Sequence, residues 1–178
     1  ISGIASNSGV SGGTIEGEGG TSIIARGVVY GFSEEPSIGI DLVTEDGIGT
    51  GNFMSQMTTL VPNATYYVRA YVSNSSTTTY GSQISFITDE LSDIDGNSYA
   101  AVQVGTQAWL AENLDATSLN DGTAIPNETN ISAWSNLTTP AYDYYTDGDY
   151  PDKVQNGSIY APLYNWYTVQ TGLVCPTG

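Results

Sequence analysis

The sequence predicts a mainly β protein of two domains, a two-layer β-sandwich followed by a small mixed α+β domain. Three observations lead to this prediction. Gly, Ser, Thr and Asn dominate the polar residues while charged residues are only 12%, which favours strands and turns over helices. Several short segments alternate apolar and polar residues and are separated by turn residues. The 178 residues leave room for two domains of roughly 90 residues each.

The segment Leu60 to Val72, LVPNATYYVRAYV, is predicted to be the central strand of the first domain. Leu60 and Pro62 close a loop, and the side chains that follow should alternate between the two faces of a sheet. One face would carry Tyr66, Val68, Ala70 and Val72, and the other Tyr67, Arg69 and Tyr71. The spacing Leu60-x-Pro62-x-x-Thr65-Tyr66 resembles the tyrosine corner of fibronectin type III and immunoglobulin-like sandwiches, which implies that the Tyr66 hydroxyl bonds to upstream backbone.

Six further segments of the first domain are predicted to be strands because each is a short apolar or alternating run bounded by turn residues. They are Ile1 to Ser6, Val10 to Glu16, Ser22 to Phe32, Ile38 to Val43, Thr50 to Met57 and Tyr80 to Thr88. Together with the central strand they make about seven strands in residues 1–88, as a sandwich requires.

Four stretches, ARGVVYG, GTGNF, LVPNATYYVRAYVSN and YGSQISFIT, resemble the immunoglobulin-like, fibronectin-type repeats of large Bacteroidetes surface proteins. The resemblance covers most of residues 1–88. It implies an immunoglobulin-like sandwich that serves as a spacer or an adhesive module. The alternative interpretation is a sandwich domain that only holds another part of the protein in place.

Residues 89–92 are predicted to link the two domains, because strand alternation stops there and charged and turn residues begin. A tight turn at Asp95-Gly96 or Gly96-Asn97 should lead into a strand at Tyr99 to Val104, which returns at Ala108 to Leu114. Two helices are expected. The first is a short turn at Ser132 to Leu137 with Ser132 as its N-cap, and the second runs from Tyr160 to Val169.

Five stretches of residues 93–178 resemble a domain found in many copies in Fibrobacter succinogenes and in Bacteroidetes, usually called the major paralogous domain. They are DIDGNSYAAVQVGTQAWLAENL, NDGTAIPN, AWSNLTTPAYDYY, YAPLYNWYTV and TGLVCPTG. In that family the CPTG is followed by a further stretch, so the resemblance implies an incomplete, amino-terminal part of the domain. Family members often carry Cys where this chain has Asp143, so a family disulfide to Cys175 lacks its partner here.

The charge balance excludes several classes of function. Nineteen acidic residues against three basic ones give a net charge of −16, which repels nucleic acid and anionic membrane surfaces. No apolar run is long enough for membrane insertion. The absence of His removes Ser-His-Asp, Cys-His and His-ligated zinc chemistry. Paired carboxylates would be the remaining acid–base machinery, and no pair stands out, so no enzymatic activity is expected.

An acidic loop is the candidate metal site. Asp147, Asp149 and Asp152 lie among Gly and Pro residues, and calcium binds several carboxylate and carbonyl oxygens at one point. The spacing matches no EF-hand loop, and the alternative interpretation is a solvated acidic turn. Apart from calcium at this loop, no cofactor is expected.

Aromatic residues concentrate between Trp134 and Tyr167. Tyr144, Tyr145 and Tyr150 lie beside the acidic loop and are candidates for stacking on a glycan. The alternative is that a domain poor in Leu and Ile builds its core from Tyr and Trp, which bury large areas while their polar tips form hydrogen bonds.

These observations together predict an extracellular structural or adhesive protein of the cell surface, a filament subunit or stalk; the alternative is a carbohydrate-binding module of a secreted surface protein. Self-association is the expected partnership, with polysaccharide as a second partner. We expect polymerisation by strand exchange, with the Gly-rich segment Ile1 to Ile15 of one copy adding to the sheet of another.

Overall fold

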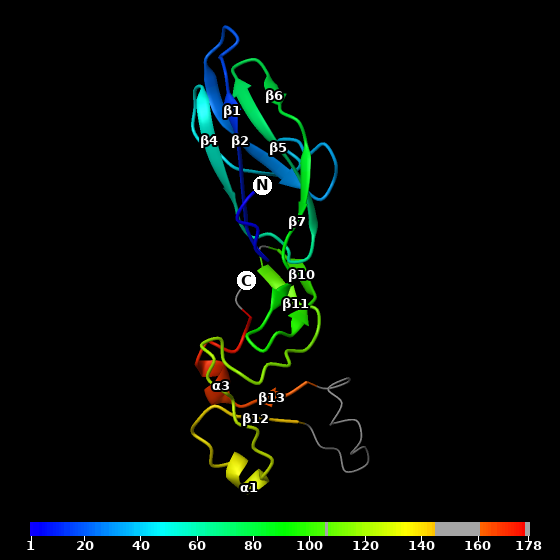
Figure 1. The fold of residues 1–178 in the computed structure, drawn as a ribbon, viewed down its shortest axis with the longest axis vertical. Helices are drawn as coiled ribbons and strands as arrows, with labels where there is room; N and C mark the ends of the chain where they lie inside the picture. Colours follow the sequence, from blue (N-terminus) through cyan, green and yellow to red (C-terminus); the bar gives the residue numbers. More distant parts are fainter. Residues whose placement is uncertain (106, 145–160, 177–178) are drawn as a thin grey trace. The chain divides into compact units, whose positions relative to one another are not determined.

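The computed structural model describes residues 1–105, 107–144 and 161–176. It divides into two compact units, Ile1–Asp89 with Gly105–Ala108, and Glu90–Val104 with Trp109–Gly178. Strands dominate both units, and the two described helices, α1 and α3, are one turn long (Figure 1). The predicted mainly β fold is confirmed. No helix among the described residues is long and apolar enough to cross a membrane.

The first unit contains seven strands in two sheets. They are β1 (Gly9–Ile15), β2 (Ile23–Gly31), β3 (Leu42–Val43), β4 (Gly51–Met57), β5 (Thr65–Asn74), β6 (Thr78–Tyr80) and β7 (Ile84–Ile87). The smaller sheet pairs β1 with β4, and the larger has the order β3-β2-β5-β6, with β7 also on β5. All pairings are antiparallel.

Three predicted strands of this unit differ from the structure. The segment Ile1 to Ser6 forms only the isolated bridge Ser2–Val10. Residues 38–41 form a turn in which the Asp41 N–H donates to the Ser37 carbonyl, so β3 is two residues long. The last strand divides into β6 and β7, which pair with successive parts of β5.

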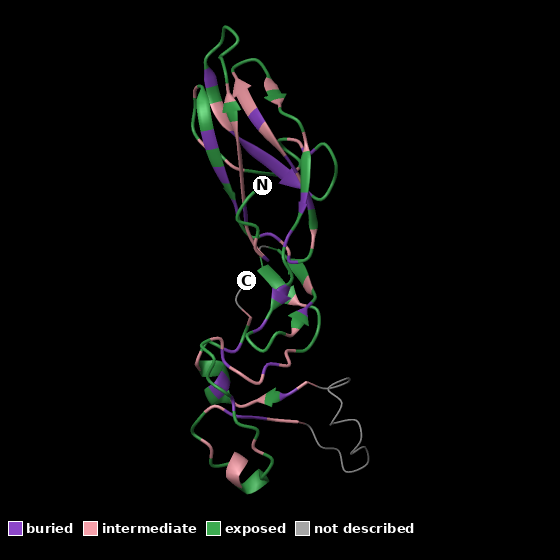
Figure 2. Ribbon diagram, viewed as in Figure 1, coloured by how far each residue is buried: buried purple, intermediate pink, exposed green. Residues whose placement is uncertain are grey.

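The core of the first unit lies between the two sheets. Buried and exposed residues alternate along β4, which is banded in Figure 2, whereas the second half of β2 is buried throughout. The buried cluster takes side chains from both sheets and from the loop before β5: Val28, Tyr30, Phe53, Met57, Leu60, Tyr66, Val68 and Phe86.

Tyr66 ties the start of β5 to the preceding loop. Its ring is 1% exposed and its hydroxyl accepts a hydrogen bond from the Val61 N–H at 3.1 Å. Burial raises the pKa of Tyr66, with the Val61 bond acting in the opposite direction. Leu60 and Pro62 are buried beside it. The hydrogen bond from Val61 gives the buried hydroxyl of Tyr66 a partner at the point where the chain enters the sheet.

Arg69 holds residues 33–41 against the outer face of the larger sheet. Its Nε donates to the Pro36 carbonyl at 2.6 Å, and its guanidinium forms an ion pair with Glu35. The same guanidinium lies 4.0 Å from the centre of the Tyr80 ring, a cation–π contact. Pro36 is fully buried as a result.

Arg26 plays the equivalent role for residues 46–50. Its Nε donates to the Asp46 carbonyl, and one terminal nitrogen donates to the carbonyls of Gly49 and Thr50. Two of the three basic residues of the chain therefore hold loops of this unit by binding backbone oxygens.

The second unit contains short strands and two described helices. They are β8 (Leu91–Ser92), β9 (Ser98–Tyr99), β10 (Ala101–Val104), the second half of β11 (Gln107–Leu110), α1 (Ile131–Trp134), β12 (Tyr142–Asp143), β13 (Leu163–Tyr164) and α3 (Trp166–Gln170). Pairs form between β8 and β9, β10 and β11, and β12 and β13. Its hydrophobic cluster is Leu119, Ile125, Tyr142 and Val174.

The predicted helix from Tyr160 to Val169 is wrong over residues 161–165, and Tyr160 lies outside the described residues. Leu163 and Tyr164 form β13, paired with β12, and the helix begins only after Asn165, whose side chain accepts from the Thr168 N–H. The predicted N-cap at Ser132 is also wrong. Asn130 caps α1, because its side-chain oxygen accepts from both Ser132 and Ala133.

We expect Arg69→Lys to lower the free energy of unfolding of the first unit by about 1–3 kcal/mol, because an ammonium cannot keep both the Pro36 bond and the Tyr80 contact. Hydrogen exchange resolved to residues 1–89 measures this, since all three Trp residues lie in the second unit. The control Glu35→Gln removes only an exposed ion-pair partner and should cost less than about 1 kcal/mol. Equal effects of the two changes would contradict this role of Arg69.

Candidate functional site

The best-defined polar cluster of the second unit surrounds Asp93, which is 8% exposed. One carboxylate oxygen accepts from the Tyr99 hydroxyl at 2.5 Å and from the Asn97 side-chain amide at 2.9 Å. The other accepts from the Asn97 N–H at 2.9 Å. The turn at residues 93–97 brings these donors together, because Gly96 has the positive φ that closes the loop.

The same cluster reaches the segment 115–118. The Tyr99 hydroxyl accepts from the Asp115 N–H at 3.0 Å, and Asn97 donates to the Asp115 carbonyl. Asp95 accepts from the N–H groups of Thr117 and Ser118 at 2.6 and 2.9 Å. The β8–β9 hairpin is thus joined to a distant segment by neutral hydrogen bonds to Asp115 and by bonds to the Asp95 carboxylate, which are the stronger kind.

Two carboxyl groups of the cluster have lowered pKa values. Burial acts to raise the pKa of Asp93, but the hydrogen bonds from Tyr99 and Asn97 outweigh it and the pKa is lowered. Burial also acts to raise the pKa of Asp95, but hydrogen bonds from Ser118 and Thr117 lower this pKa below its ordinary value. Both groups are therefore favoured as carboxylates in the folded protein.

The pKa values of Tyr99 and Asp115 are raised instead of lowered. Burial and the Asp93 hydrogen bond raise the pKa of Tyr99 from 10.0 to about 12. Burial, followed by the charges of Asp93 and Asp95, raises the pKa of Asp115. The cluster therefore holds a neutral phenol between carboxyl groups.

This cluster stabilises the fold and is poorly suited to hold a metal. Both carboxylate oxygens of Asp93 and one of Asp95 already accept protein hydrogen bonds, which a cation would have to displace. Among the described residues no group of three or more His, Cys, Asp or Glu is arranged to hold a metal ion. The sequence reasoning missed the partnership of Tyr99 and Asp115, although an Asp-Gly turn closely followed by a Tyr is a usable signal.

Most of the predicted ligand residues lie outside the described residues: Asp147, Asp149, Asp152, Tyr145 and Tyr150. Calcium binding at that loop stays a prediction. Tyr144 is described and half-buried. Its ring meets Tyr142 in a T-shaped contact with centroids 5.6 Å apart, beside the hydrophobic cluster. This location matches the alternative in which the aromatic residues build the core.

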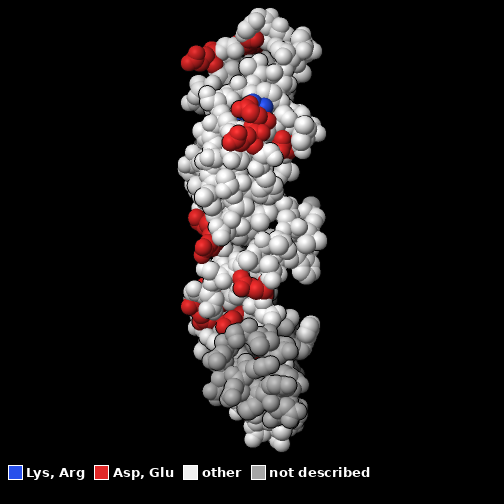
Figure 3. Space-filling model, turned by 90° about the vertical axis from the view of Figure 1, so that its right-hand side faces the viewer, with Lys and Arg blue, Asp and Glu red and all other residues white. Residues whose placement is uncertain are grey.

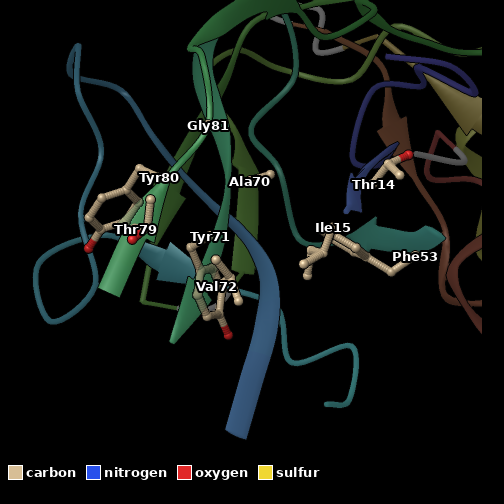
Figure 4. Close-up of a pocket in the computed structure, with 9 residues that line it drawn as sticks. All are labelled: Thr14, Ile15, Phe53, Ala70, Tyr71, Val72, Thr79, Tyr80 and Gly81. Atoms are coloured by element: carbon tan, nitrogen blue, oxygen red, sulfur yellow. The ribbon is translucent and has the colours of Figure 1, made fainter. Parts of the chain in front are cut away.

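The first unit has a groove where its two sheets separate. The groove has a volume of about 230 Å³. Ile15 and Phe53 lie on one side and β5 and β6 on the other (Figure 4). Its lining carries no charged residue: Thr14, Ile15, Phe53, Ala70, Tyr71, Val72, Thr79, Tyr80 and Gly81. An uncharged opening is notable in a chain of net charge −16, whose carboxylates form separate groups on the face shown in Figure 3.

The groove forms because the smaller sheet has only two strands in the described residues and the larger sheet has five. Within the described part of the chain β1 pairs with β4 on one edge, and its other edge carries only the Ser2–Val10 bridge. The two strands lie over β2 and β5, so β6 and the neighbouring part of β5 have no strand above them. Within the predicted donor segment Ile1 to Ile15, residues Gly9–Ile15 form a strand paired with β4 of the same chain, and strand exchange between copies stays a prediction.

Residues 102–178 match the family model of the Fibrobacter succinogenes major domain. The second unit is thus similar to that domain over most of its length, as its sequence motifs predicted. No curated protein and no solved structure matched the chain. The domain match gives no reaction or ligand, so function has to be argued from the surfaces described above.

We expect Tyr99→Phe to lower the stability of the second unit by about 1–2 kcal/mol at neutral pH, because Asp93 and the Asp115 N–H lose a partner. The folded pKa of Tyr99 is raised from 10.0 to about 12. Its contribution to stability is therefore complete below pH 10 and lost as the pH rises from 10 to 12.

Denaturation followed by Trp fluorescence reports this unit alone. The variant should show a weaker loss of stability between pH 10 and 12 than the parent. An unchanged pH dependence would mean that Tyr99 does not donate to Asp93. Tyr167→Phe, which changes an exposed ring, is the control and should alter stability at neutral pH by less than about 0.5 kcal/mol.

Asp115→Asn should raise stability at pH 7, by less than about 1 kcal/mol, because it removes a charge that the fold disfavours. The raised pKa of Asp115 means that the gain should vanish at acid pH, where the carboxyl is protonated in both states. Asp121→Asn is a control of opposite sign: the Thr123 N–H lowers the pKa of Asp121, so this change should reduce stability. A loss of stability in Asp115→Asn would contradict the prediction.

Proposed function

We propose that this chain is an extracellular structural or adhesive building block of a bacterial cell surface, a subunit or stalk of a filament, whose first unit is an immunoglobulin-like module. The observation that carries the proposal is the open edge of β1 above the uncharged groove of the first unit. Exposed backbone at a sheet edge is a ready site for pairing with another chain.

The charge distribution supports self-association through this edge. Two copies of a chain with net charge −16 repel each other wherever their carboxylates meet. Strand β1, with the sequence GVSGGTI, carries no charge, and neither does the groove beside it. Contact at this place avoids the repulsion that the rest of the surface imposes.

The polar clusters support a structural role over a catalytic one. Asp93 and Asp95 accept hydrogen bonds from the protein itself, and Arg26 and Arg69 hold loops. We assign the chain no enzymatic activity and no obligatory cofactor. Its membership of the Bacteroidetes surface proteins and its extracellular location are parts of the same proposal, supported by the resemblance of residues 1–88 and by the domain match of the second unit.

Electron microscopy of the native material, with antibody labelling of intact cells, tests this function. Labelled filaments or stalks at the cell surface are the expected result. A chain that stays monomeric at high concentration in light scattering, and that is absent from the cell surface, would contradict it.

Carbohydrate binding is the second candidate, because two Trp side chains of the second unit are largely exposed. Trp109 is 57% and Trp166 69% exposed, and flat amphipathic rings of this kind often serve as binding surfaces. Retention on insoluble glycans that is lost in Trp166→Ala or Trp109→Ala would favour this function. Retention that is absent, or equal in the parent and both variants, would exclude these rings as the site.

A further inference from the structure

We propose that ionic strength regulates the association between copies of this chain: dissolved ions screen a surface of unpaired carboxylates, so that salt strengthens the contact. This rests on the proposed function and names the regulation of its self-association. The structural reason lies in the two described arginines, because the fold uses both of them internally. The described residues therefore offer a second copy many carboxylates and no free basic side chain to pair with its own.

Arg69 is committed within its own unit. Its side chain is 12% exposed. The guanidinium forms an ion pair with Glu35, donates to the Pro36 carbonyl at 2.6 Å and lies 4.0 Å from the centre of the Tyr80 ring. Pairing with a carboxylate of another copy would break the contacts that hold residues 33–41, so Arg69 is unsuited to an ion pair between copies.

Arg26 is used in a similar way, on backbone oxygens. Its Nε donates to the Asp46 carbonyl at 3.1 Å, and one terminal nitrogen donates to the carbonyls of Gly49 and Thr50 at 3.2 and 2.9 Å. A carbonyl group carries no net charge, so these bonds hold the loop and pair the guanidinium with no carboxylate. The third basic residue, Lys153, lies outside the described residues.

Most of the carboxylates are left without an ion-pair partner. The pair between Arg69 and Glu35 is the one ion pair among the residues that the structure describes. The first unit has eight acidic residues against two arginines, a net charge of −6. Figure 3 shows the acidic side chains of one face as separate groups, with a basic side chain at a single place among them. Four exposed acidic residues of the first unit without an ion pair are Glu16, Glu18, Glu34 and Glu45.

Repulsion between two such surfaces depends on the ions in solution. The range of a charge is about 30 Å at 0.01 M salt, about 10 Å at 0.1 M and about 3 Å at 1 M. A contact that is held by ion pairs weakens as salt is added, whereas a contact that forms against like charges becomes stronger. The described charges create the second situation, wherever on the described surface the contact lies.

Repulsion between like charges is already visible inside the second unit. Burial, followed by the charges of Asp93 and Asp95, raises the pKa of Asp115, because a third carboxylate is disfavoured beside two others. No described residue of this unit is basic and could offset the group. A second copy that brings further carboxylates close meets the same kind of repulsion, in an exposed form that salt can screen.

Sedimentation of the purified chain over a range of NaCl concentrations tests the proposal. The association constant should rise at least about tenfold between about 0.01 M and about 1 M salt, because the range of each charge falls from about 30 to about 3 Å. An association constant that falls with salt, or that stays the same, would overturn the proposal.

A charge variant separates screening from the general salting-out of apolar surface. It combines Glu16→Gln, Glu18→Gln, Glu34→Gln and Glu45→Gln, which changes the net charge of the first unit from −6 to −2. This variant should associate more tightly than the parent at low salt and should depend less on salt. The matched control, Glu→Asp at the same four positions, keeps the charge and should behave as the parent does. Equal salt dependence in the parent and the Gln variant would overturn the proposal.

Magnesium and calcium chloride separate screening from a specific cation site. Screening depends on the charge and concentration of the ions and not on their identity, so the two salts should act alike at equal concentration. Strengthening by calcium alone would assign the effect to a calcium site and would also overturn the proposal.

The two proposals can fail separately. Filaments at the cell surface that dissociate as salt is added would leave the proposed function standing and exclude regulation by screening. Association that salt strengthens, in a chain that is absent from the cell surface, would support the regulation and contradict the proposed function.

Discussion

Strand β5 must bury both of its faces, and the first unit is arranged around that requirement. It pairs with β2 on one edge and with β6 and β7 on the other. Tyr66 and Val68 point into the space between the sheets, and Tyr71 is buried on the opposite face, where its hydroxyl donates to the Thr44 carbonyl. A strand covered on both sides needs a second sheet on one face and a well-held loop on the other.

The two faces of β5 are covered by different means. The inner face is covered by β1 and β4 through apolar packing. The outer face is covered by residues 33–41, which Arg69 holds through Glu35 and the Pro36 carbonyl. A planar guanidinium suits this role because it can donate to several oxygens at once and also lie on Tyr80.

The second unit replaces part of an apolar core with a polar network. Its hydrophobic cluster is small, and Asp93, Tyr99 and the backbone of Asp115 join segments that lie far apart in the sequence. Such a network stabilises only when its members are all satisfied. In the described residues no buried side-chain nitrogen or oxygen lacks a partner. Both carboxylate oxygens of Asp93 accept hydrogen bonds from Tyr99 and Asn97, so this network uses its charge to join the segments.

Alternation of side chains was enough to predict the main strands, including β5 and the burial of Tyr66 and Val68, because a period of two is a local property of the backbone. Sequence motifs also predicted the similarity of the second unit to the Fibrobacter succinogenes major domain. The pairing of β1 with β4, the loop-holding bonds of Arg26 and Arg69, and the network around Asp93 could not be predicted, since each joins residues distant in the sequence. Leu163 and Tyr164 show the reason most directly: local propensity favoured a helix, but pairing with β12 made them a strand. The sequence by itself determined the main strands and the classes of partner that the charge disfavours. Only the tertiary structure decided that β1 pairs with β4 in a sheet separate from that of β2 and β5, because strand partners are selected by packing between distant segments.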